Sequence, residues 1–99
     1  MSEQQFTESF ALLVDELAAL EHQRWAHWQQ YVHEKGERRP DGSLVLPAEL
    51  VARWQRQIDT AYEDLSNEEK ESDREQVQKY LPILKRWLQQ SRWKDESNA

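Results

Sequence analysis

The sequence contains no cysteine. That absence excludes a disulfide framework, a thiolate metal site and a thiol nucleophile. Glycine is also scarce, with only Gly36 and Gly42 in 99 residues, so there is no glycine-rich loop of the kind that cradles phosphates. Long apolar runs are missing, and residues 1–7 lack a basic region followed by an apolar segment. We therefore expect neither a membrane span nor a signal peptide, and we place the protein in the cytoplasm.

Basic charge is in short supply. Thirteen Lys and Arg residues against nineteen Asp and Glu residues give a formal net charge of −6. Because duplex nucleic acid and anionic membranes are bound through a basic face, we expect neither as a partner. A small anion can still be bound locally, since charges beyond a Debye length of roughly 8 Å are screened. The arginines that could serve it are concentrated in the middle of the chain: Arg24, Arg38, Arg39, Arg53, Arg56 and Arg74.

What the chain has instead is aromatic bulk, with five Trp, three Tyr and two Phe residues. A few large rings must therefore supply much of the core. The length fits one domain over residues 1–99, with residues 1–5 and 94–99 frayed, and leaves no room for a deeply buried active site.

Apolar spacing predicts an all-α fold of three to four helices with one loop or short hairpin. Apolar residues recur every three or four positions from about residue 7 to residue 35, which indicates a long first helix. Both glycines lie in residues 36–43, which we expect to form a loop or a hairpin turned at Asp41-Gly42. A short second helix should start at Pro47. A third should start after Ser66 and be kinked or restarted at Pro82.

Residues 66–76 read as a helix start yet contain no apolar side chain. Ser66 and Glu69 have the spacing of a capping box, in which each side chain bonds the other residue's backbone N–H. Lys70, Asp73 and Arg74 have no such explanation. They are either a solvated ion-pairing surface or part of a site that binds charge.

Aromatic and charged residues are neighbours in two other segments, Glu21-His22-Gln23-Arg24-Trp25 with Trp28 and Arg53-Trp54. Arginine forks fit phosphate and aromatic faces fit a base. The structural alternative is that the tryptophans are core residues and that the arginines extend along them toward solvent.

Two of these motifs resemble one family. Glu21-His22-x-Arg24-Trp25, followed by Tyr62-x-x-Leu65-Ser66-x-x-Glu69-Lys70-x-x-Asp73-Arg74, is similar to the RyR domain, a small helical module repeated in ryanodine receptors and also found in bacterial and phage proteins. The likeness spans residues 17–84. The Gly-Trp-x-Tyr-Gly element usual after the first helix of that family is absent here and is replaced by His33-Glu34-Lys35-Gly36 and an insertion that contains Trp54.

The resemblance implies a module that binds a nucleotide-derived ligand, such as a cyclic nucleotide or an ADP-ribose derivative, without transforming it. A phage-encoded protein of this kind would work in the host cytoplasm, as a sponge that sequesters an immune nucleotide signal in an anti-defence role. On this hypothesis Trp25, Trp28 or Trp54 stacks the base, Arg24, Arg53 and Arg74 hold phosphate, and His22, Tyr62 and Asp73 orient the ligand. The full candidate set is His22, Arg24, Trp25, Trp28, Arg53, Trp54, Tyr62, Lys70, Asp73 and Arg74.

Two other interpretations stay open. The exposed aromatics could serve an adaptor or inhibitor that binds a host protein, and surplus Trp and Leu could make a homo-oligomer.

Catalysis has less support, and we expect no enzyme, cofactor or metal. Glu68-x-x-Glu71 supplies one carboxylate pair of the kind that binds magnesium, but a second pair on another helix is missing. The spacing of His22, His27 and His33 spreads them around a helix, which does not suit zinc.

Overall fold

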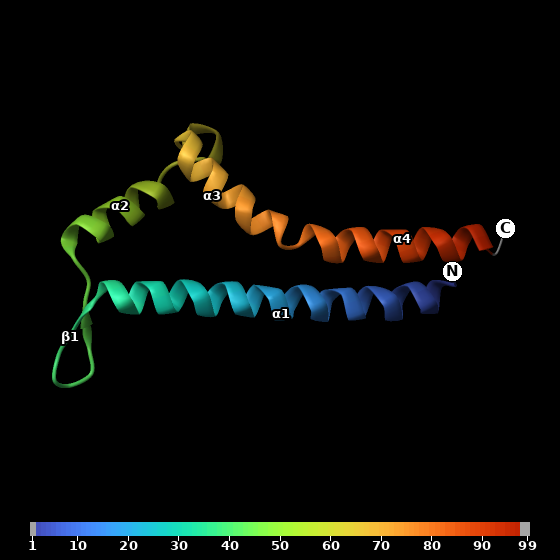
Figure 1. The fold of residues 1–99 in the computed structure, drawn as a ribbon, viewed down its shortest axis with the longest axis horizontal. Helices are drawn as coiled ribbons and strands as arrows, with labels where there is room; N and C mark the ends of the chain where they lie inside the picture. Colours follow the sequence, from blue (N-terminus) through green and yellow to red (C-terminus); the bar gives the residue numbers. More distant parts are fainter. Residues whose placement is uncertain (1, 98–99) are drawn as a thin grey trace. The chain divides into compact units, whose positions relative to one another are not determined.

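In the computed structural model the backbone is described for residues 2–97 and the side chains for residues 2–90. Over that backbone the chain is mostly helical (Figure 1). Its elements in order are α1 (Glu3–Lys35), β1 (Glu37–Arg38), β2 (Leu44–Val45), α2 (Ala48–Ile58), the 3-10 turn η1 (Tyr62–Asp64), α3 (Asn67–Gln78) and α4 (Leu81–Ser97). The prediction of an all-α fold with one hairpin is confirmed.

The structure divides into two compact units, which are described separately. The terminal unit comprises Met1–Arg24 and Arg74–Ala99, and the central unit is Trp25–Asp73. Helix α1 continues through both units, so the expectation of one domain over residues 1–99 stays a prediction. The expected fraying of residues 1–5 and 94–99 falls in part outside the described residues and also stays a prediction.

Helix α1 starts earlier than its apolar pattern indicates, at Glu3 instead of about residue 7. The reason is a capping box: the N–H of Gln5 donates to the Ser2 hydroxyl at 3.1 Å, and the N–H of Ser2 donates to the Gln5 side chain at 3.0 Å. These bonds satisfy donors that a helix start leaves unpaired.

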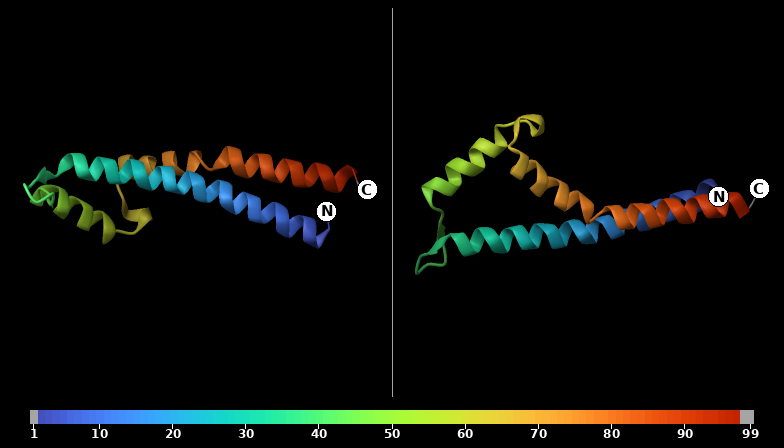
Figure 2. Two further views of the ribbon diagram at one scale, coloured as in Figure 1. Left: turned by 90° about the horizontal axis from the view of Figure 1, so that it is seen from below. Right: turned by 45° about the horizontal axis from the view of Figure 1, so that its top comes forward.

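In the terminal unit, α4 runs alongside the first part of α1 in the opposite direction (Figures 1 and 2). The hydrogen bonds show this antiparallel order: Ser9, early in α1, bonds Trp87, and Glu21, later in α1, bonds Tyr80, just before α4. Leu13 lies between them, and with 6% of its surface exposed it is the only buried residue among residues 2–90. The core of this unit is therefore thin.

Helices α3 and α4 are separate elements. Hydrogen bonds from the N–H groups of Lys79 and Tyr80 to the carbonyls three residues earlier close the end of α3. Pro82 is the second residue of α4, where a missing N–H costs no intrahelical bond. The predicted restart at Pro82 is confirmed.

Within the central unit, α1 ends at Lys35 and a hairpin follows it. Strand β1 pairs with β2 in antiparallel register, with Arg38 opposite Leu44. Asp41 accepts hydrogen bonds from the N–H and the hydroxyl of Ser43 at 2.9 and 2.6 Å, and Gly42 has a φ of +90°. Positive φ favours glycine because it has no Cβ. The predicted turn at Asp41-Gly42 is confirmed.

The predicted capping box at the start of α3 is also present. The N–H of Glu69 donates to the Ser66 hydroxyl at 3.1 Å, and the N–H of Ser66 donates to the Glu69 carboxylate at 3.3 Å. The same carboxylate accepts a bond from Gln57 at 2.7 Å and pairs with Arg56 at 3.5 Å. Glu69 therefore starts α3 and also fastens it to α2.

Candidate functional site

The aromatic cluster of the central unit is made of Trp28, Tyr31 and Trp54. The Trp28 and Tyr31 rings stack with centroids 5.4 Å apart and an interplanar angle of 27°. The Trp28 and Trp54 rings are in an edge-to-face type of arrangement, with centroids 5.6 Å apart and an interplanar angle of 66°. Both geometries are favourable for aromatic pairs. The cluster brings together two of the tryptophans that the sequence proposed as base-stacking residues.

Trp28 keeps 44% of its surface exposed. Its neighbours hold the ring in place, and the rest of the side chain is open to solvent. The Lys35 ammonium lies 5.4 Å from the centroid of the Tyr31 ring, which is a cation–π distance. The cluster therefore has a positive charge at one end.

The local structure follows from the sequence of α1. Trp28, Tyr31 and Lys35 are three and four residues apart, so they lie along one stripe of the helix. The hairpin after α1 then returns the chain, and α2 carries Trp54 to this stripe. Arg53 precedes Trp54 on α2 and is exposed.

Tyr62 and Lys70 form a second contact in the central unit. The Lys70 ammonium lies 5.8 Å from the centroid of the Tyr62 ring, and 47% of Tyr62 is exposed. Lys70, which the sequence left unexplained, thus has a structural partner. Trp25 and Asp73 are exposed residues of this same unit.

Arg24 belongs to the terminal unit and is paired there. Its Nε donates to the Glu21 carboxylate at 3.0 Å, and its Nη2 binds the other oxygen of that carboxylate. The Tyr80 hydroxyl donates to Glu21 as well. Arg24 first, and then Tyr80, lower the pKa of Glu21 from its usual 4.5 to about 2, and the bond to Glu21 raises the pKa of Tyr80. A phosphate would have to compete with Glu21 for this guanidinium.

His22 and Arg74 are exposed residues of the terminal unit. The ten candidate residues are therefore divided between the two units. Within single units the structure joins Trp28 with Trp54 and Tyr62 with Lys70, and it pairs Arg24 with an acid outside the candidate set.

The candidate set omits Tyr31 and Lys35, which complete the aromatic cluster. Spacing could have identified both, because Tyr31 and Lys35 fall on the stripe of Trp28. The hydrogen bond from Tyr80 to Glu21 could not be predicted from nearby sequence, because the two residues are 59 positions apart.

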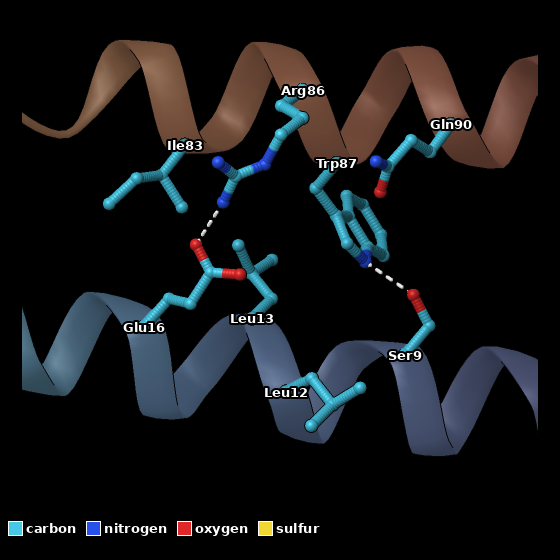
Figure 3. Close-up of a pocket in the computed structure, with 8 residues that line it drawn as sticks. All are labelled: Ser9, Leu12, Leu13, Glu16, Ile83, Arg86, Trp87 and Gln90. Atoms are coloured by element: carbon cyan, nitrogen blue, oxygen red, sulfur yellow. Dashed lines mark hydrogen bonds and ion pairs between the residues drawn. The ribbon is translucent and has the colours of Figure 1, made fainter.

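A small hollow in the terminal unit lies between α1 and α4 (Figure 3). Its volume of about 90 Å³ equals that of roughly three water molecules and is well below the 300 Å³ or more of typical ligand pockets. The Glu16–Arg86 ion pair and the bond from the Trp87 indole to the Ser9 hydroxyl, 2.8 Å long, cross it. None of the candidate residues lines this hollow, and a nucleotide does not fit it.

Among the residues with described side chains, no three His, Asp or Glu residues gather as metal ligands. Within the described part of the chain, no helix combines the length and apolarity needed to cross a membrane. Comparisons with protein-family models, curated proteins and solved structures found no match for this chain.

Proposed function

We propose that this chain is a non-catalytic binding module for a nucleotide-derived small molecule, and that the base stacks on the aromatic cluster of the central unit. The observation that carries the proposal is the half-exposed Trp28 ring, held in place by Tyr31 and Trp54. Stacking on such a ring is tolerant of base identity and contributes about 1–3 kcal/mol per base.

The charges around the cluster suit a phosphorylated ligand. Lys35 sits over the Tyr31 ring, and Arg53 adjoins Trp54 in sequence. A cation at each side of the stacked base would hold phosphate groups, and the arginine would do so with two parallel bonds. Arg24 contributes less on this proposal because its guanidinium is already paired with Glu21.

The resemblance of residues 17–84 to the RyR domain supports the same ligand class. We extend the proposal to a biological role on that basis: the module sequesters a cyclic nucleotide or ADP-ribose derivative that acts as an immune signal. Binding without turnover is what sequestration requires.

Isothermal titration calorimetry against cyclic nucleotides, linear nucleotides and ADP-ribose tests the proposal. We expect one ligand class to bind, and Trp28→Ala to weaken its affinity by about 5- to 150-fold, the range that corresponds to one lost base stack. Arg53→Gln should weaken binding too. Arg39→Gln, which removes an exposed arginine from the hairpin, is the matched control and should not.

Circular dichroism must first show that the variants keep their helical content. Flat titrations of the wild-type protein with every ligand would refute nucleotide binding, and so would equal losses from Arg53→Gln and Arg39→Gln.

An adaptor function is the second candidate, favoured by one feature of α2. Val51 and Ile58 lie on the same side of this helix as Trp54, and they are 46% and 74% exposed. An amphipathic helix of a host protein, with its apolar side against Val51 and Ile58, would fit that side. Ile58→Lys should abolish such an interaction in a pull-down with wild-type protein as reference, while leaving nucleotide titrations unchanged.

A further inference from the structure

The terminal unit exposes a continuous row of large apolar side chains on α1. Phe6, Phe10 and Val14 are four residues apart, so they line one side of the helix. Their exposed fractions are 47%, 48% and 48%. Helix α4 packs on the side of α1 where Leu13 is buried, and it reaches this row through Trp87.

Helix α4 continues this row. Trp87 contacts the rings of Phe6 and Phe10 edge-on, with centroids 5.8 and 6.2 Å apart. Successive residues of a helix are rotated by about 100°. Leu84 and Leu88 therefore lie on one side of Trp87, and Arg86 lies on its other side.

Both rows lie on one side of the helix pair. The Glu16–Arg86 ion pair marks the other edge of the contact between α1 and α4 (Figure 3). We call the combined surface the apolar face, and its members are Phe6, Phe10, Val14, Leu81, Leu84 and Leu88. Leu81 and Leu88 are 38% and 57% exposed.

Charge is distributed very unequally over the two helices. From Glu3 to Arg24, α1 carries one arginine, Arg24, and five acidic side chains, namely Glu3, Glu8, Asp15, Glu16 and Glu21. Residues 81–90 of α4 carry Lys85 and Arg86 and no acid. Each helix is thus complementary to the other and repels its own kind.

We propose that the apolar face binds the same face of a second copy of this chain, forming a two-fold symmetric four-helix bundle. The charges select the arrangement. A two-fold axis parallel to the helices places each α1 beside the partner's α4, in the antiparallel orientation already present within one chain. A perpendicular axis in the plane between the faces would instead stack acidic α1 on acidic α1.

The area of the face is appropriate to a stable dimer. The 22 residues of α1 inside the terminal unit span about 33 Å at a rise of 1.5 Å per residue, and two packed helices are about 20 Å wide. The footprint of roughly 660 Å² is close to the roughly 800 Å² per partner of standard interfaces.

The symmetry also fixes the register, because rotation about an axis parallel to the helices does not move residues along them. Within one chain Glu16 is level with Arg86. Asp15 lies on the outer side of α1, and it is offset from the partner's Lys85 by about 3 Å along the axis, since each lies one residue earlier on antiparallel helices with a rise of 1.5 Å per residue. The two side chains can span that offset. Each dimer has two such pairs at its outer edges.

Sedimentation velocity on the full chain tests the dimer. We expect a dimer at micromolar concentration, and at least a tenfold higher dissociation constant for Val14→Asp and for Leu88→Lys. Leu12→Asp is the matched control, because Leu12 is 67% exposed but lies outside the apolar face. It should leave the dimer intact.

A charge exchange tests the register. Asp15→Lys and Lys85→Asp should each weaken the dimer, since each places like charges together twice, and the double variant should recover most of the wild-type affinity. A wild-type monomer at about 100 µM would overturn the proposal. A dimer insensitive to Val14→Asp and Leu88→Lys, or a double variant weaker than both single ones, would overturn it as well.

Discussion

Gly42 shows how much one residue decides in a chain with only two glycines. Its φ of +90° lies in the region that a Cβ disfavours. An added Cβ would have no heavy atom within 4 Å apart from its chain neighbours, so any cost is one of backbone conformation and not of space.

We therefore predict that Gly42→Ala lowers the free energy of unfolding by about 1 kcal/mol. Gly42→Asn should lower it less, because asparagine tolerates positive φ better than alanine does. Urea denaturation followed by circular dichroism measures both. Equal losses for the two variants would show that backbone conformation is not the cause.

Glu21 should make the stability of the terminal unit depend on pH in the acid range. Its pKa is about 2 in the folded protein, against an ordinary 4.5, owing first to Arg24 and then to Tyr80. A carboxyl group whose pKa is lowered by folding contributes stability above its unfolded pKa and loses it as the pH falls toward the folded value. The contribution of Glu21 should disappear between about pH 4.5 and pH 2.

We accordingly predict that Glu21→Gln flattens the acid limb of the stability profile over this interval. Urea unfolding at half-unit steps of pH is the measurement. Glu8→Gln, at an exposed position of α1, is the control and should leave the slope as in the wild type. An unchanged slope in Glu21→Gln would contradict the role given to Arg24 and Tyr80.

Among the elements, helix α3 depends most visibly on its first residues, since residues 66–76 offer no apolar side chain. The Ser66 hydroxyl caps the helix and Glu69 completes the box. Loss of such a cap costs about 1 kcal/mol. We predict that Ser66→Ala lowers the free energy of unfolding by this amount and that Ser66→Asp restores most of it, both measured by urea denaturation. A neutral Ser66→Ala would mean that Gln57 and Arg56 alone hold Glu69.

Local chemistry made the elements predictable. The box at Ser66 and the turn at Asp41-Gly42 each lie within four residues of sequence, so residue type and spacing suffice to identify them. The box formed by Ser2 and Gln5 is equally local. Apolar spacing alone places the start of α1 too late, because it marks the buried side of a helix and not its first residue.

The site was less predictable because its contacts join distant residues. The stripe of Trp28 could be read from spacing on α1, but its meeting with Trp54 depends on the path of the hairpin and α2. The partner of Arg24 shows the same limit in part. Glu21 is three residues away and could have been paired from sequence, whereas Tyr80 could not.

For the whole molecule, the main fact is how little is buried. Leu13 is the only buried residue among residues 2–90, while Phe6, Phe10 and Trp28 are each nearly half exposed. Burial of apolar surface is the main favourable contribution to folding. On the proposal above, association of two copies would add to that burial.

If the second copy supplies this burial, the midpoint of thermal unfolding must depend on protein concentration. We predict a rise in that midpoint between about 1 and 100 µM protein, measured by circular dichroism at 222 nm. Val14→Asp should unfold at a lower temperature that does not change with concentration. A wild-type midpoint constant over this range would argue for a monomer.

The terminal unit is assembled from the two ends of the chain, and this has a consequence for the rate of folding. Its cross-helix hydrogen bonds join residues 59, 70 and 78 positions apart, whereas those between α2 and α3 join residues 12 and 13 apart. The entropy lost on closing a loop grows with its length, so the short loops close first. Each one that closes shortens the loop left between α1 and α4. Slow formation of the turn at Gly42 would therefore delay the pairing of α1 with α4, although the turn lies outside both helices.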